Sequence, residues 1–268
     1  MASPSPALES LLAFWADAGV EVSYADAPVD RLAQGAPPQR RAPAAGVATV
    51  SPLQSAVPAP ETAGGVAEAA RLAAEASDLA QLEAAIAAFD GCPLKFQGAR
   101  WAVFARGDPA APVMIIGEGP GAEEDLQGAP FVGRAGKLLD RMIAAAGLEG
   151  RVFITNTVFW RPPGNRNPTP AEQAVCAPFV ERAIALVRPR FLLLAGGASA
   201  KSILKQNEGI LALRGRWFEW KSGDGTVELP AMPTLHPAFL LRQPAAKKKA
   251  WEDLLTLTER LDRPERPA

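Results

Sequence analysis

Short apolar runs alternate with amphipathic stretches along the C-terminal two thirds of the chain. The runs are strand-sized, and Val113–Gly117 is the clearest of them. Between the runs, apolar residues recur at helical spacing. Strands that alternate with helices predict an α/β fold with a largely parallel sheet. The predicted strands are 113–117, 152–159, 191–196 and 231–235, and the predicted helices are 79–89, 134–146, 170–187, 198–205 and 245–261, with a hairpin over 215–229.

The order of these elements also predicts where the chemistry lies. Ligands of open parallel sheets bind beyond the carboxyl ends of the strands. We therefore expect the functional residues in the segments that follow the strands, namely 117–121, 156–166, 196–199 and 236–242.

A different pattern occupies the first 75 residues. Residues 1–26 hold a short amphipathic helical segment that either docks on the rest of the chain or binds a partner that the sequence does not identify. Residues 27–75 are rich in Ala and Pro and are predicted to form a flexible, disordered linker. The folded domain is then expected at 76–268. The apolar face of the N-terminal helix is formed by Leu8, Leu11, Leu12 and Trp15.

Charge is balanced overall but uneven along the chain. The chain has 28 Lys and Arg against 29 Asp and Glu. Residues 1–89 carry a net charge of −6 and residues 90–268 a net charge of +5, so the two parts are predicted to do different jobs. The sequence shows neither a signal peptide nor an apolar run of the roughly 20 residues that span a membrane. We therefore expect a soluble, cytoplasmic protein that does not associate with membranes.

One His and two Cys restrict the metal chemistry. Catalysis by paired histidines on a metal is excluded, and so is an iron–sulfur site with four cysteine ligands. The two cysteines also give no disulfide framework.

Glycines cluster immediately after the first buried strand, at Gly117, Gly119 and Gly121. Their spacing differs from that of nucleotide-binding loops, and the acidic residues at 123–125 would repel a phosphate. The glycines are better suited to close approach of a neutral ligand, with a carboxylate from Glu118 or Glu124 acting on water. The alternatives are a nucleotide loop and a plain turn with solvated acids.

Further polar and aromatic residues follow in the predicted loops. Phe131 is either a core anchor or a flat face on which a base stacks. Arg134 opens a helix, where a cation is unfavourable unless an anion such as a phosphate lies near. Asn156 ends a strand and either closes a turn or presents its amide to a ligand. Arg161 and Arg166 belong to a proline-rich loop that suits phosphate contact or is simply a solvated turn.

The only histidine, His236, follows the last predicted strand. Its place beside the other strand ends favours a functional role over a structural one. Leu240, Leu241 and Arg242 combine apolar side chains with a cation, as in a wedge that enters a base stack. The lysines at 247–249 add attraction to DNA or form a solvated helix face.

Four of these segments together resemble family 4 uracil-DNA glycosylases, in the right order and spacing over about residues 89–262. The resemblance implies a four-stranded parallel α/β fold in 76–268. It also implies an enzyme that flips uracil out of DNA and hydrolyses its N-glycosidic bond, leaving an abasic site in base excision repair. The segments are GEGPGAEED (117–125), PFVGRAG (130–136), RPPGNR (161–166) and HPAFLLR (236–242).

The resemblance also implies roles for individual residues. Phe131 stacks on the flipped uracil and Asn156 hydrogen-bonds its edge. His236, as a neutral donor, stabilises the charge that develops on the departing base. Glu118 or Glu124 positions the water, and we favour Glu124. The expected substrate-binding glycines are Gly117, Gly119 and Gly121, and the expected DNA contacts are Arg134, Arg161, Arg166, Leu240, Leu241 and Arg242.

The chain departs from the family at its metal-binding positions. Family 4 enzymes usually hold a [4Fe–4S] cluster on four cysteines, and the four positions here are Phe89, Cys92, Trp160 and Cys176. We therefore expect no cofactor and no bound metal, with the two cysteines as remnants of the pattern. The small Gly121 stands where relatives carry a bulky residue that excludes thymine, which leaves a wider base range open.

The leading hypothesis is a monomeric, monofunctional glycosylase acting on DNA that contains uracil. Within the same class, the alternative is a glycosylase with a broader range that includes hypoxanthine and xanthine. Outside it, the alternatives are a non-catalytic DNA-binding or polymerase-accessory module and a nucleotide-dependent enzyme. The sequence leaves the preference for single- or double-stranded DNA open.

Overall fold

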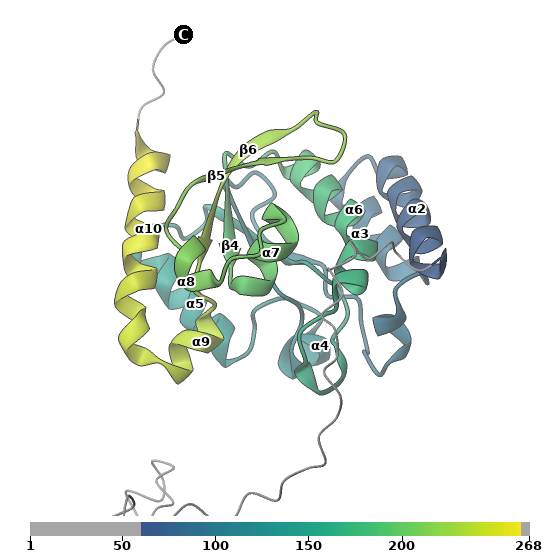
Figure 1. The fold of residues 1–268 in the computed structure, drawn as a ribbon, viewed down its shortest axis with the longest axis horizontal. Coiled ribbons are helices and arrows are strands. Elements are labelled where there is room, and N and C mark those ends of the chain that lie inside the picture. Colours follow the sequence, from purple (N-terminus) through teal and green to yellow (C-terminus); the bar gives the residue numbers. More distant parts are fainter. Residues whose placement is uncertain (1–59, 264–268) are drawn as a thin grey trace, which may run out of the picture. The chain divides into compact units, whose positions relative to one another are not determined.

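The computed structural model describes residues 60–263, drawn in colour in Figure 1. The predicted helical segment at 1–26 and the predicted linker from 27 to 59 lie outside these residues. The linker prediction is corrected at its end, because Pro60–Glu75 form helix α2. The last proline of that stretch, Pro60, stands in the first turn, where a helix tolerates proline, and the alanines that follow favour a helix.

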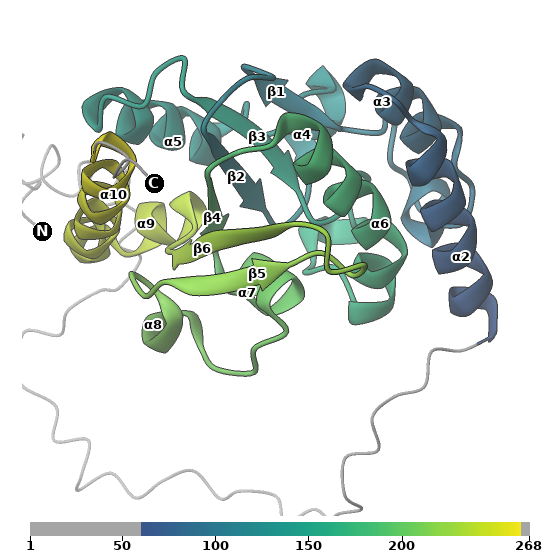
Figure 2. The same cartoon turned by 90° about the horizontal axis from the view of Figure 1, so that it is seen from above.

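The core of the described residues is a six-stranded sheet with the order β1-β3-β2-β4-β6-β5 (Figure 2). The four inner strands are parallel to one another, and each edge strand pairs antiparallel with its neighbour. The strands are β1 (Ala105–Gly107), β2 (Val113–Gly117), β3 (Val152–Asn156), β4 (Phe191–Ala195), β5 (Phe218–Lys221) and β6 (Glu228–Thr234).

The parallel four-stranded core agrees with the prediction, but the strand count was too low. β1 has 3 residues, too few for a periodic pattern to show. The predicted hairpin is formed by β5 and β6, and its second strand continues to Thr234. Pro230 and Pro233 interrupt the apolar pattern there, so that one strand was interpreted as two.

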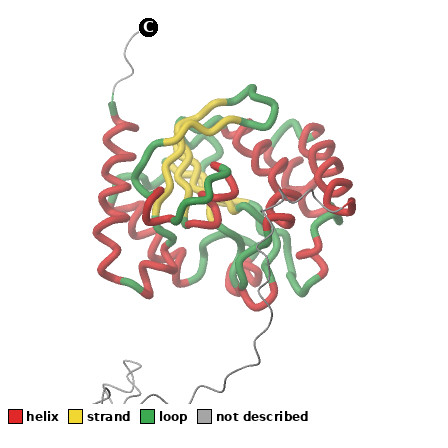
Figure 3. Tube along the Cα trace, viewed as in Figure 1, coloured by secondary structure: helices red, strands yellow, loops and turns green. Residues whose placement is uncertain are grey.

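Helices cover both faces of the sheet, with the strands as the middle layer (Figure 3). None of the helices described within 60–263 is long and apolar enough to cross a membrane. Asp78 caps the first predicted helix as expected, accepting a hydrogen bond from the Gln81 amide at 2.8 Å. Besides α2, the helices are α3 (Leu79–Ala88), α4 (Ala122–Gln127), α5 (Arg134–Ala145), α6 (Pro170–Val187), α7 (Gly197–Leu204), α8 (Ile210–Leu213), α9 (Pro237–Arg242) and α10 (Lys247–Asp262), with short turns η1 (Pro93–Phe96), η2 (Pro163–Asn165) and η3 (Pro244–Ala246).

Two apolar clusters hold these layers together. Met114 and Ile116 of β2 pack with α2, α3 and α6, whereas Val113 and Ile115 pack with α5 and α10 on the opposite face. Figure 2 shows the same division, with α2, α3 and α6 on one side of the strands and α5 and α10 on the other. Because both faces are covered, β2, β3 and β4 are buried along their whole length, which explains their continuous apolar runs.

The parallel core brings the ends of distant segments together. β2 ends at Gly117 and β3 at Asn156, and these two residues are partners in the sheet register. β6 ends at Thr234, so that His236 follows at the same edge of the sheet. The carboxyl ends of the inner strands therefore converge where the sequence predicted the chemistry.

Candidate active site

A cleft of about 450 Å³ opens at this edge of the sheet. It brings together residues from three of the four predicted segments, 117–121, 156–166 and 236–242, and none from 196–199. Of the predicted site residues, it is lined by Glu118, Gly119, Gly121, Glu124, Phe131, Asn156, Arg166, His236 and Arg242.

Asn156 forms the polar floor of the cleft. Its side chain is 1% exposed, and Oδ1 is the single buried side-chain oxygen or nitrogen without a hydrogen-bond partner in the described part of the chain. A buried amide oxygen without a partner costs about 1–3 kcal/mol. The protein therefore maintains an unsatisfied acceptor facing a cleft, which is the arrangement expected of a group that bonds a ligand.

Gly117 lies beside this amide and does not line the cleft itself. A side chain at Gly117 would collide with Asn156 Oδ1 and would lie 2.6 Å from the ring of Phe131. The glycine is required because only its lack of a Cβ lets the aromatic ring and the amide come together.

Phe131 presents its ring to the cleft from a constrained loop. Its φ of 55° is in the left-handed region, which non-glycine residues rarely adopt. The ring is 5% exposed, and its centroid lies 5.6 Å from that of the His236 ring. Gly136 permits this loop, because a side chain there would overlap the Phe131 carbonyl.

Two charged residues hold the Phe131 loop through its backbone. Glu124 Oε1 accepts from the amides of Val132 and Gly133 at 3.0 and 2.9 Å. From the other side, the Arg106 guanidinium donates to the carbonyls of Pro130 and Phe131 at 2.8 and 3.2 Å. Arg106 also pairs with Asp140 at 2.6 Å. Hydrogen bonds to charged groups are the strong ones, so this grip can maintain the unfavourable φ at Phe131.

The second oxygen of Glu124 is also engaged, since Oε2 accepts from the Gly121 amide at 3.1 Å. A Cβ on Gly121 would lie 2.7 Å from that oxygen, so the carboxylate occupies the space beside this glycine. Glu124 thus ties the glycine-rich loop to the Phe131 loop.

Glu118 is the carboxylate of the cleft whose pKa is shifted. Burial raises its pKa above the usual value. Its backbone carbonyl accepts from Thr157 Oγ1 at 2.6 Å, which anchors the loop to the end of β3. Glu118 therefore offers the cleft a carboxylate with raised proton affinity on a fixed backbone.

His236 caps α9, and this contact fixes its tautomer. Nδ1 accepts a hydrogen bond from the Ala238 amide at 3.2 Å. Burial, together with the nearby charge of Arg242, lowers the pKa of His236 to about 4. The ring is therefore neutral at physiological pH, and its single proton lies on Nε2.

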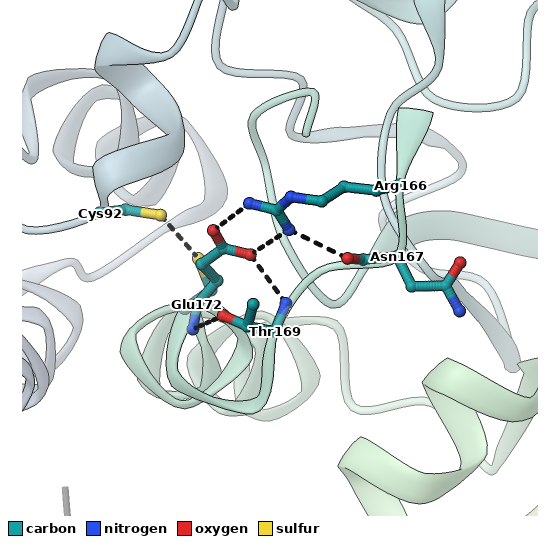
Figure 4. Close-up of polar contacts among 6 residues, drawn as sticks. Cys92, Arg166, Asn167, Thr169 and Glu172 are labelled. Atoms are coloured by element: carbon teal, nitrogen blue, oxygen red, sulfur yellow. Dashed lines mark hydrogen bonds and ion pairs between the residues drawn. The ribbon is translucent and has the colours of Figure 1, made fainter. Parts of the chain in front are cut away.

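The proline-rich loop is anchored differently from the prediction. Arg166 forms a bidentate ion pair with Glu172 at 2.6 and 2.9 Å (Figure 4). Glu172 is buried, and it also accepts from the Thr169 amide at 2.7 Å in a capping box at the start of α6. Arg161 bonds Asn165 Oδ1 at 2.7 Å within the same loop and does not line the cleft. Arg166 therefore secures the wall of the cleft instead of presenting a free fork to phosphate.

The remaining predicted DNA contacts divide between surface and core. Arg134 is exposed at the start of α5 but does not line the cleft. Arg242 is exposed and lines the cleft. Leu241 is 38% exposed, whereas Leu240 is fully buried against Leu235 and Ala250. The prediction of a two-leucine wedge is corrected, because the Leu240 side chain is part of the core.

Sequence reasoning missed the two residues that position the others. Arg106 belongs to a strand too short to predict. The pairing of Glu172 with Arg166 is seen only in the folded structure. The signal that could have found Glu172 is the capping pattern Thr169-Pro170-Ala171-Glu172 at the start of a strong helix.

Comparison with known protein families identifies the superfamily of the chain. The model of the uracil DNA glycosylase superfamily matches residues 104–255. The chain belongs to this superfamily. It is 41% identical over 171 residues to the Type-4 uracil-DNA glycosylase of Sulfurisphaera tokodaii, covering 62% of this chain and 77% of the relative. The Type-4 enzyme of Pyrobaculum aerophilum is 38% identical over 183 residues, 66% of this chain and 91% of the relative. The Type-4 enzyme of Thermotoga maritima is 39% identical over 154 residues, which cover 56% of this chain and 77% of the relative.

These relatives contradict the prediction that the protein takes no cofactor. Type-4 uracil-DNA glycosylases are iron–sulfur cluster enzymes, so a prediction drawn from two ligand positions alone was wrong.

The four positions at which the resemblance to family 4 enzymes implies cluster ligands come together in the fold. Cys92 and Cys176 are fully buried, with their sulfur atoms 4.0 Å apart. Phe89 and Trp160 lie at the other two positions, with ring centroids 6.5 Å apart. Two thiols do not fit a four-cysteine ligand set, and no group of three or more His, Cys, Asp or Glu suited to a metal occurs among the described residues. No catalytic role is therefore assigned to a cluster.

Proposed function

We propose that this chain is a uracil-DNA glycosylase, which removes uracil from DNA by hydrolysing its N-glycosidic bond and leaves an abasic site. The observation that carries the proposal is the buried, unpartnered Oδ1 of Asn156 beside an aromatic ring. The relatives named Type-4 uracil-DNA glycosylases support it.

Recognition of the base rests on Asn156 and Phe131. Uracil presents a donor at N3–H and an acceptor at O4, which match the acceptor and donor of the Asn156 amide. Cytosine presents the reverse order, so its N3 would face Oδ1 with no proton between them. The ring of Phe131 provides the stacking face for a base flipped out of the helix.

Cleavage of the bond places negative charge on the departing base. As the bond between C1′ and N1 breaks, the electron pair moves onto uracil and is shared with O2. The neutral His236 donates from Nε2 to this oxygen and stabilises the developing charge. Water then adds its hydroxide to C1′, and its proton passes to the carboxylate that orients this water and finally to N1 of the released uracil.

Glu118 is the better candidate for orienting that water. Both oxygens of Glu124 are taken by backbone amides, whereas the Glu118 carboxylate lines the cleft without such partners within residues 60–263. The sequence-based preference for Glu124 is therefore replaced by a division of work. Glu118 orients the water, and Glu124 positions the two loops.

The same surface would hold the DNA. Arg242 at the cleft and Arg134 at the start of α5 are placed to contact phosphates, and Leu241 to enter the gap left by the flipped base. Among the described residues that line the cleft there is no lysine to form a Schiff base with the sugar, so a monofunctional enzyme is proposed.

Single-turnover cleavage of a panel of oligonucleotides tests the proposal. Each carries one uracil, hypoxanthine, xanthine or thymine, and alkali breaks the abasic site. Strand breaks at uracil only after alkali treatment are expected, and breaks before it would contradict a monofunctional enzyme. Faster excision of hypoxanthine or xanthine would support the broader glycosylase, and no excision of any base would favour the DNA-binding module.

A further inference from the structure

A second hollow lies beside the cleft and is not used by the mechanism above. It is an apolar groove of about 300 Å³ between α5, α9 and α10. Its walls are Leu138 and Met142 of α5, Leu240 of α9, and Lys247, Lys248 and Trp251 of α10.

The groove joins the proposed DNA surface through two shared helices. Ala135 of α5 lines the cleft, and the groove begins three residues later at Leu138. On α9, Arg242 lines the cleft and Leu240 lines the groove. Along α5 the groove is about 5 to 10 Å from the cleft, the length of about one to three nucleotides at 3.4 Å per base.

The charge of the groove suits an anion. Lys247 and Lys248 are exposed in the first turn of α10, and neither forms an ion pair with another described residue. No acidic residue lies in the first turn of α10 or among the described walls of the groove. Cations at a helix N-terminus oppose the helix dipole, so an external anion would stabilise them there.

The groove also presents an exposed aromatic ring. Trp251 is 37% exposed, one helical turn beyond Lys247 and Lys248. An aromatic face next to unpaired cations combines the two contacts used for nucleic-acid strands, stacking on a base and attraction to its phosphate.

We propose that this groove binds a nucleotide of the DNA strand adjacent to the flipped base, with Trp251 against the base and Lys247 and Lys248 at the phosphates. The inference rests on the proposed function, because it takes DNA as the ligand. The groove then holds the flanking strand while the cleft binds the flipped nucleotide.

Binding to an oligonucleotide with 2′-fluorodeoxyuridine, whose glycosidic bond resists cleavage, tests the inference. Trp251→Ala should raise the Kd about tenfold, within the range given by the loss of one stacked base, and Trp251→Phe should restore most of the affinity. Lys247→Ala with Lys248→Ala should reduce the slope of log Kd against log salt by about 1.4 to 1.8. All three effects should vanish when the oligonucleotide is trimmed to one nucleotide on each side of the lesion.

Two exposed residues elsewhere provide matched controls. Phe96 on η1 is 68% exposed, and the Lys221 side chain on β5 is 61% exposed. Phe96→Ala and Lys221→Ala should leave the Kd and the salt slope unchanged. Groove variants that bind like wild type, while wild type excises uracil, would overturn the groove and leave the proposed function intact. Groove effects in a protein that excises no base would support the groove and overturn the proposed activity.

Discussion

Asn156→Ala should separate function from stability. Asn156 lies at the end of β3 with an unpartnered, buried Oδ1. Removing that oxygen relieves about 1–3 kcal/mol of desolvation cost, while the lost packing of the short side chain costs about 1–2 kcal/mol. The two terms nearly cancel, so the free energy of unfolding should change by less than about 1 kcal/mol, or about 2–4 °C in Tm.

Activity should respond very differently to the same change. Without the amide, the polar edge of a bound uracil is buried with no partner, and single-turnover excision should slow by about 100-fold or more. The assay pairs thermal unfolding with excision from a uracil oligonucleotide under enzyme excess.

The adjacent residue offers a control with the opposite result. Thr155 is fully buried, and its Oγ1 donates to the Phe104 carbonyl at 2.8 Å. Thr155→Val removes that hydrogen bond and should cost about 0.5–1.5 kcal/mol of stability with excision unchanged. A loss of more than about 2 kcal/mol in Asn156→Ala, the size of a broken buried hydrogen bond, would refute the view that this amide is reserved for a ligand.

Three further outcomes are expected. Burial raises the pKa of Glu118, while that of His236 is lowered to about 4, so excision should fall on the acid side as Glu118 gains a proton. In rates measured from pH 5 to 9, where His236 stays largely neutral, Glu118→Gln should abolish that fall, and a fall that persists in the variant would exclude Glu118 as its source. Arg106→Gln should loosen the Phe131 loop and lower kcat/KM by about tenfold, because the hydrogen bonds from Arg106 to the loop carbonyls are charge-assisted. Arg106→Lys should restore part of the activity. An equal loss in Asp140→Asn would instead implicate the ion pair between Arg106 and Asp140. Burial alone would raise the pKa of Glu172, but Arg166 and Thr169 lower it below its usual value. The ionised Glu172 therefore stabilises the fold above pH 4.5, and this contribution is lost as the pH falls through the lowered pKa. In urea unfolding, the free energy of unfolding of Glu172→Gln should fall less steeply toward acid pH than that of wild type, and an identical pH profile would contradict this.

The parallel core could be predicted because each of its central strands is marked by a pattern within its own few residues. β2, β3 and β4 are buried on both faces and so appear as continuous apolar runs, and the helix at 170–187 was predicted with its observed bounds. Edge strand β1 and helix α2 were missed for the opposite reason, since β1 is too short to show a period and α2 continues an Ala/Pro-rich stretch.

The site was predicted as a set of positions but not as a set of contacts. Strand ends located Glu118, Asn156 and His236 at one edge of the sheet, where the structure has them. That Glu124 is fully occupied by backbone amides, and that Arg166 is paired with Glu172, depends on loops folding back over long separations in sequence. The spacing of residues along the sequence does not predict such contacts.

Release of free uracil from a single-uracil oligonucleotide, compared between wild type and His236→Ala under enzyme excess, tests the central claim most directly. Wild type should release uracil and leave an alkali-labile site, and the variant should be slower by about 100-fold or more, because it lacks the neutral donor to O2. Folded wild-type protein that releases no uracil, or a variant as fast as wild type, would contradict the claim that this cleft removes uracil from DNA.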